Sequence, residues 1–150
     1  RNVDAWVISD YGYGGFDDAL RSLLREIAGR KPVVADSRFA IHQFRGMSVI
    51  KPNEEEAEAA ARALGVTADD SAALACALAT KLEASWGIGE GGAAGPTGNR
   101  YGDPPGHAWV AVAGRGEASR HVLTGDDDRV ANMAAFARAA LELLLEQLET

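Results

Sequence analysis

The sequence predicts an α/β protein, a three-layer α/β/α sandwich whose mostly parallel sheet ends in a C-terminal antiparallel hairpin. Three observations support this fold class. Short apolar runs alternate with amphipathic helical patterns in the first half of the chain. Two further strand patterns near the C-terminus are separated by a tight turn. A long helical pattern then closes the chain.

The first half contains three strand patterns and two helix patterns. The strands are short apolar runs bounded by polar residues or turns, at residues 4–10, 32–36 and 48–51. A glycine-rich turn at residues 11–15 leads into a helix over residues 16–29, which Gly29 is suited to end. Asn53 is a good N-cap for a helix from Glu54 to about Leu64, with Gly65 as its stop. Strands that alternate with helices in this way predict a parallel sheet covered on both faces.

The second half begins with an alanine-rich helix that starts at Thr67 or Asp70 and ends near Lys81 or Glu83. A buried strand is expected at residues 85–89, followed by a long glycine-rich stretch at residues 90–106. Ten of the 17 glycines lie between residues 87 and 116, which indicates unusual backbone conformations or close approach of a ligand. The hairpin follows, with strands at residues 107–113 and 120–123.

The closing helix follows three aspartates and reaches about Leu148. The aspartates at residues 126–128 are most simply capping charges at its start. We expect its apolar stripe to pack on the sheet. The stripe comprises Val130, Met133, Ala134, Ala137, Leu141, Leu144, Leu145 and Leu148.

Length and composition restrict the class of protein. The 150 residues correspond to a single domain, and 47% hydrophobic with 25% charged residues is typical of a globular chain. The net charge of −7 is spread over both halves and leaves no basic stripe, so nucleic acid is not an expected partner. Without a long apolar run or a signal peptide, we expect no membrane partner and a cytoplasmic location. Cys76 is the single cysteine and is expected to pack as a small hydrophobe.

Three segments stand out within residues 4–64 of the N-terminal half, namely DAWVISDYGYG, PVVADSR and FRGMSVIKPNEEEAEAA. In their order and spacing they resemble the PfkB, or ribokinase-like, carbohydrate kinases, most closely the heptose-phosphate kinase branch. The resemblance implies that Asn53 and Glu56 correspond to the family's Asn-x-x-Glu motif, which organises magnesium and phosphate. The family's Gly-Ala-Gly-Asp element, which carries the catalytic base, does not occur in this sequence.

Two segments stand out within residues 74–148 of the C-terminal half, namely WGIGEGGAAGPTGNRYGDPPGHAWVAVAG and TGDDDRVANMAAFARAALELL. They resemble the C-terminal domain of the CinA family, the nicotinamide mononucleotide deamidases. Residues 92–96 correspond to the family's Gly-x-Ala-Gly-Pro loop. The family's Glu-Ser-Cys-Thr-Gly-Gly segment, which carries its nucleophilic serine, is missing.

Together the two resemblances suggest a chimera, with a kinase-like segment at residues 1–66 and a CinA-like segment at residues 67–150. The first residue is Arg1 rather than Met, which favours an engineered chain, although a natural fusion stays open. The main hypothesis is a recombined or designed domain without a complete catalytic site, which retains at most weak binding of a nucleotide or phosphate. The alternatives are a CinA-like nicotinamide mononucleotide amidohydrolase and a fragment of a PfkB-type sugar kinase.

Candidate ligand-binding residues lie at predicted strand ends, at one helix start and in the glycine-rich loop. They are Asp10, Asp36, Asn53, Glu56, Gly92, Ala93, Gly95 and Arg100. The loop can cradle a phosphate through backbone amides, with Arg100 as its charge partner, or it can be an ordered loop without a ligand. Asp10 and Asp36 either bind a ligand or cap turns. Asn53 with Glu56 is first of all a capping box.

No residue is assigned a catalytic role, and no cofactor is expected. Ser9 and Ser37 are the serines at strand ends that a relocated deamidase nucleophile would use. His42, His107 and His121 lack the spacing of metal ligands, so no metal site is predicted. Exposed sheet edges make a homodimer possible.

Overall fold

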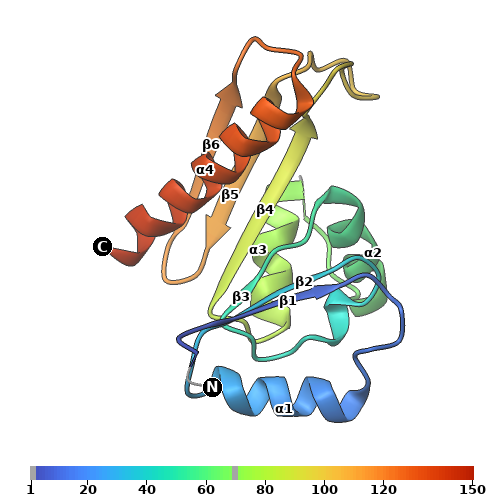
Figure 1. The fold of residues 1–150 in the computed structure, drawn as a ribbon, viewed down its shortest axis with the longest axis vertical. Helices are drawn as coiled ribbons and strands as arrows, with labels where there is room; N and C mark the ends of the chain where they lie inside the picture. The colour runs from blue at the N-terminus through green and yellow to red at the C-terminus, as the bar shows by residue number, and fades with distance from the viewer. Residues whose placement is uncertain (1–2, 69–70) are drawn as a thin grey trace.

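The computed structural model describes residues 3–68 and 71–150 and contains one six-stranded mixed sheet (Figure 1). The strands follow one another across the sheet in chain order. They are β1 (Trp6–Asp10), β2 (Val33–Ser37), β3 (Val49–Ile50), β4 (Trp86–Ala93), β5 (His107–Ala113) and β6 (Glu117–Leu123). β1 to β4 are parallel, whereas β5 and β6 form an antiparallel hairpin beside β4. The predicted fold class is confirmed.

Helices lie on both faces of the sheet, but over different strands. They are α1 (Asp18–Ala28), the short 3₁₀ helix η1 (Ile41–Gln43), α2 (Glu54–Leu64), α3 (Ser71–Lys81) and α4 (Arg129–Leu148). One core joins α1, α2 and α3 to the apolar side chains of β1, β2 and β3. A second core joins α4 to β4 and β5 on the opposite face. Figure 1 shows α4 running along the hairpin and β4, apart from α1.

The strand order explains this division. Parallel crossovers are right-handed, so strands added in one direction place their connecting helices on one face. The opposite face of β1 is therefore open, and Val7 is 77% exposed there. The expectation that helices cover both faces of the parallel strands therefore holds at β4, which lies between α3 and α4, but not at β1.

Helix ends follow the local sequence signals. Asp17 caps α1, and its carboxylate accepts the backbone N–H of Leu20. Asn53 and Glu56 form a complete capping box at the start of α2, and Gly65 ends that helix with a φ of 66°. Of the two predicted caps of α3, Asp70 lies outside the described residues. Asp128, the last of the three aspartates, caps α4.

The face that α4 turns to the sheet differs from the prediction. Its buried side chains are Asn132, Phe136, Ala139, Ala140 and Leu143. Most of the predicted stripe points away from the sheet, with Val130 78% and Leu141 64% exposed, although Leu144 packs against the second core. The helix has two apolar sides, and helical periodicity does not say which one packs. Small residues at 139 and 140 let the helix approach Val110 and Val112 closely, which favours the observed side.

Strand β4 is longer than predicted, because its glycines do not show the alternation of apolar and polar residues that indicates a strand. The strand continues to Ala93, past its predicted end at residue 89, because Gly91 and Gly92 pair with β5. A Cβ atom at Gly92 would lie 2.2 Å from the carbonyl oxygen of His107. Glycine at this position therefore permits the close pairing of β4 and β5. Strand β6 also begins earlier than predicted, at Glu117 instead of Arg120.

Candidate functional site

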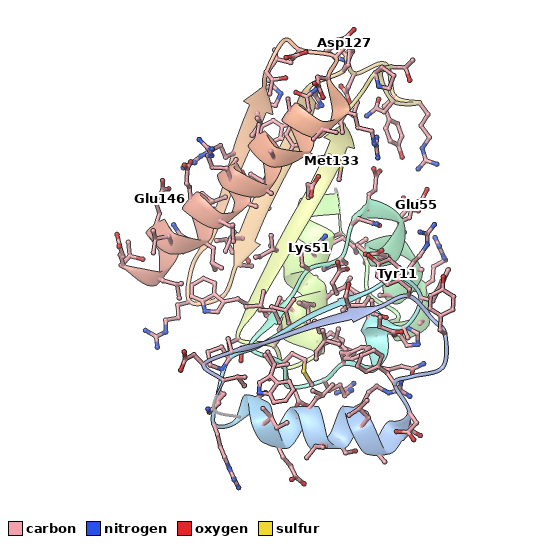
Figure 2. The ribbon with its side chains drawn as sticks, in the orientation of Figure 1. Tyr11, Lys51, Glu55, Asp127, Met133 and Glu146 are labelled. Carbon is pink, nitrogen blue, oxygen red and sulfur yellow. The ribbon has the colours of Figure 1, made fainter. Side chains whose placement is uncertain are left out.

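A row of polar side chains lies where β1, β2 and β3 end, on the sheet face opposite α1 to α3. Ser9 of β1 is in register with Asp36 of β2, and Lys51 follows β3, its backbone N–H donating to the carbonyl of Ala35. Side chains alternate along a strand, and the neighbours of Ser9 and Asp36 point into the first core. Ser9, Asp36 and Lys51 therefore share the open face. We call this row the strand-end site, and Figure 2 shows Lys51 between α2 and α4 in projection.

The start of α2 adds a carboxylate to the strand-end site. Partial burial raises the pKa of Glu56, and the backbone N–H of Asn53, which donates to its carboxylate at 2.9 Å, opposes that rise. The negative charge of Asp36 raises the pKa of Glu56 further, whereas Lys51 and Arg38 lower it. Asp36, Lys51 and Arg38 therefore lie within electrostatic range of Glu56 at the ends of β2 and β3. Of the predicted residues, Asp36, Asn53 and Glu56 are thus brought together.

Asp10 and Ser37 are engaged in a buried turn instead. The carboxylate of Asp10 accepts the backbone N–H of Gly12 at 2.9 Å and the hydroxyl of Ser37 at 2.8 Å. The Ser37 oxygen also accepts the N–H of Ala40 at 3.1 Å, and both side chains are buried. Asp10 therefore holds the chain reversals after β1 and β2, which is the turn-capping alternative considered for it. Ser9 differs, because it is exposed.

The glycine-rich loop docks against a different side of α2. Gly92 and Ala93 are the last residues of β4, and the loop proper follows them. The Tyr101 hydroxyl donates to Glu54 at 3.0 Å, and the guanidinium of Arg100 donates to that hydroxyl and lies 3.9 Å from Glu58. Successive helical residues are about 100° apart, so Glu54 and Glu58 face away from Glu56. Arg100 is exposed, but it lies on the other flank of α2 from the strand-end site.

Asn132 fastens the other end of this loop, and sequence reasoning missed it. Its amide group donates to the carbonyls of Ala94 at 2.9 Å and Asp126 at 2.8 Å, and its oxygen accepts the Thr124 hydroxyl. Gly95, with a φ of 107°, follows Ala94 directly in the loop. The available signal was a single asparagine among apolar residues in the closing helix. Its side chain is buried, so it joins the loops after β4 and β6 to α4.

Within residues 3–68 and 71–150, no group of three His, Cys, Asp or Glu side chains could hold a metal ion. The rings of His107 and His121 pack 4.7 Å apart, and Trp109 lies 4.9 Å from His121. No helix in the described part of the chain has the length and apolar character needed to cross a membrane.

Comparisons with known proteins give one family match and several solved structures of similar fold. The model of the CinA C-terminal domain matches residues 55–148, which includes α2. The structure is similar to a competence-damaged protein (CinA) superfamily protein from Escherichia coli, with a TM-score of 0.50 and 20% identity over 95% of this chain and 80% of that one. It is also similar to the competence damage-inducible protein A from Klebsiella pneumoniae, with a TM-score of 0.52 and 21% identity over 97% and 86% of the two chains. No curated protein gives a significant match.

These findings support only the CinA part of the chimera hypothesis. The family match begins eleven residues before the expected end of the kinase-like segment at residue 66, so α2 falls on the CinA side. Neither a kinase half nor a junction between two families is shown. A designed domain without a catalytic site, the main hypothesis from the sequence, is not supported. The match covers well over half of the 150 residues, and the chain belongs to the CinA C-terminal domain family.

Proposed function

We propose that this protein is an amidohydrolase that releases ammonia from the carboxamide of nicotinamide mononucleotide. The observation that carries the proposal is the family match, which includes the glycine-rich loop and the strands on either side of it. The resemblance of residues 92–96 to the Gly-x-Ala-Gly-Pro loop of the deamidases gives the substrate class. This proposal replaces the hypothesis of a domain without activity.

The strand-end site supplies groups suited to this chemistry. Ser9 presents an exposed hydroxyl, whereas the hydroxyl of Ser37 is buried and donates to Asp10. Asp36 is in register with Ser9 on the neighbouring strand and shares its open face. Lys51 and Arg38 provide positive charge near the site, which favours a phosphorylated ligand. We therefore assign Ser9 as nucleophile and Asp36 as the group that accepts its proton.

The proposed reaction has two steps. The Ser9 oxygen attacks the amide carbon of the substrate while its proton passes to Asp36, and that proton then leaves with the amide nitrogen as ammonia. Water attacks the resulting ester, gives a proton to Asp36 and releases nicotinate mononucleotide. The returning proton restores the Ser9 hydroxyl. Water is the only co-reactant, so the step needs no cofactor.

The test is ammonia release from nicotinamide mononucleotide, measured for the purified chain and its variants. Ser9→Ala should lower the rate at least about 100-fold, because a covalent step loses its nucleophile. Asp36→Asn should lower the rate of ammonia release by about 100-fold or more, because the reaction loses its general base. Ser119→Ala is the matched control, since Ser119 is an exposed serine on β6, away from the site, and should leave the rate unchanged.

Two results would contradict the proposal. Absence of ammonia release by the unaltered chain refutes amidohydrolysis, and calorimetry with the same nucleotide then decides between a binding domain and one without a ligand. Full activity in Ser9→Ala refutes the assignment of the nucleophile but leaves the reaction in place. Adding ATP and a phosphorylated sugar to the unaltered chain tests the kinase alternative in the same preparation.

A further inference from the structure

The outward side of α4 carries a continuous apolar stripe. Its members are spaced alternately four and three residues apart, the spacing by which two helices pack along a seam. They are Val130, Ala134, Ala137, Leu141, Leu144 and Leu148. Leu144, at the edge of the stripe, is half-buried against the second core, and the other five are exposed. The helix has 20 residues and is therefore about 30 Å long. An apolar surface of this length on a folded domain indicates an interface.

We propose that two copies of this chain associate through antiparallel packing of their α4 helices. The side chains of the stripe are smaller in the N-terminal half of α4 and larger in its C-terminal half. Antiparallel packing about a two-fold axis near Ala139 sets Val130 opposite Leu148 of the second copy. It also sets Ala134 opposite Leu144 and Ala137 opposite Leu141. Each small side chain then meets a large one, whereas parallel packing would leave gaps between alanines and crowd the leucines.

A hollow beside the stripe fits the same arrangement. It has a volume of about 330 Å³ and is lined mainly by alanines, with Arg138 and Glu142 at one end. Leu145 flanks the stripe on this side and is exposed. In the antiparallel arrangement, Leu145 of the second copy lies level with the end of the hollow formed by Ala131 and Ala134. A leucine entering a hollow between alanines is the packing expected of paired helices.

Charges on the same flank are complementary. Arg138 makes no ion pair with any of the residues that the structure describes, and Glu142 lies four residues beyond it. Across the two-fold axis, Arg138 falls about 3 Å along the helix from both Glu142 and Arg138 of the second copy, so the two Glu142 side chains offset the two arginines that meet at the axis. Glu142 now lies 3.6 Å from Arg120, which also pairs with Glu146 at 2.7 Å. Arg120 therefore keeps a partner when Glu142 turns to the second copy.

Sedimentation velocity from 1 to 100 μM tests the proposal. The unaltered chain should form a species of twice its 15.7 kDa mass, and Leu141→Glu should abolish that species while leaving the circular dichroism spectrum unchanged. Leu123→Glu is the matched control, because Leu123 is an equally exposed leucine on the edge strand β6. It should dimerise normally. Loss of the dimer in Leu123→Glu alone would instead support association through a sheet edge.

A charge exchange tests the antiparallel register. Arg138→Glu alone and Glu142→Arg alone should each weaken association about tenfold, and the double variant should return to within about threefold of the unaltered chain. Recovery in the double variant cannot arise from a folding defect. A chain that stays monomeric at 100 μM overturns the proposal, as does a dimer that Leu141→Glu leaves intact. Failure of the double variant to recover overturns the antiparallel register.

Discussion

Asn132 offers a direct test of how the glycine-rich loop is held. Its side chain makes three hydrogen bonds, two as donor to the carbonyls of Ala94 and Asp126 and one as acceptor from Thr124. Replacement by alanine removes all three and leaves two carbonyl oxygens without their donor. The loops after β4 and β6 then lose the side chain that joins them to α4.

The size of the effect follows from these contacts. A net contribution of about 1 kcal/mol for each hydrogen bond gives a loss of about 3 kcal/mol in the free energy of unfolding. For a chain of 150 residues, that corresponds to a fall of about 6–12 °C in Tm. Asn132→Asp keeps the size of the side chain but places a carboxylate against two carbonyl oxygens. It should therefore be less stable at pH 8 than at pH 5, where protonation begins to remove the charge.

Urea denaturation followed by circular dichroism measures both variants. Arg129→Ala is the control, because Arg129 also donates to this loop, at Gly95, but from an exposed position at 3.3 Å. It should lose less than about 0.5 kcal/mol. Limited proteolysis should cut residues 94–106 faster in Asn132→Ala than in the control. A loss below 1 kcal/mol in Asn132→Ala, with unchanged proteolysis, would refute the view that this residue holds the loop.

Three further substitutions test the start of α2 and the pairing of β4. Asn53→Ala should lower the free energy of unfolding by about 1 kcal/mol in urea melts, because the helix loses its cap. The pKa of Glu56 is raised in the native state, so its protonation stabilises the fold at pH values below its ordinary pKa of about 4.5. This stabilisation is lost as the pH rises through the raised pKa. Glu56→Gln should thus gain stability relative to the unaltered chain from pH 4 to pH 7, and a flat difference would contradict this. Gly92→Ala should lower the free energy of unfolding by more than about 2 kcal/mol, because the new Cβ atom would clash with the carbonyl oxygen of His107. Gly15→Ala, with open space around it, should leave the free energy of unfolding unchanged.

Local signals predicted much of the fold. The strands at the start of the chain are bounded by turns, and the helices begin at side chains that can accept backbone N–H groups. Asn53 illustrates this, because both halves of its capping box are readable from four residues. Such features depend on neighbours in sequence and are predictable for that reason.

Features that depend on distant contacts were not predictable in the same way. The buried side of α4 depends on how closely Ala139 and Ala140 approach the sheet. The end of β4 depends on pairing by Gly91 and Gly92, whose missing side chains carry no alternating pattern. The same distinction between local and distant contacts applies to the candidate site. Its capping pair was predictable, whereas Asn132 acquires its role only when three separate segments meet.

The sheet also explains where the candidate site lies. Consecutive parallel strands place α1 to α3 on one face, and α4 covers the other face only from β4 onward. The helical cover thus changes sides at β4, which leaves Ser9, Asp36 and Lys51 uncovered beside it. The loop that leaves β4 contacts both helix layers. Its Tyr101 donates to Glu54 of α2, and its Ala94 carbonyl accepts from Asn132 of α4. The loop thus links the two helix layers on the flank of α2 away from the strand-end site, so weakening the link at Asn132 should lower stability without displacing Ser9, Asp36 or Lys51.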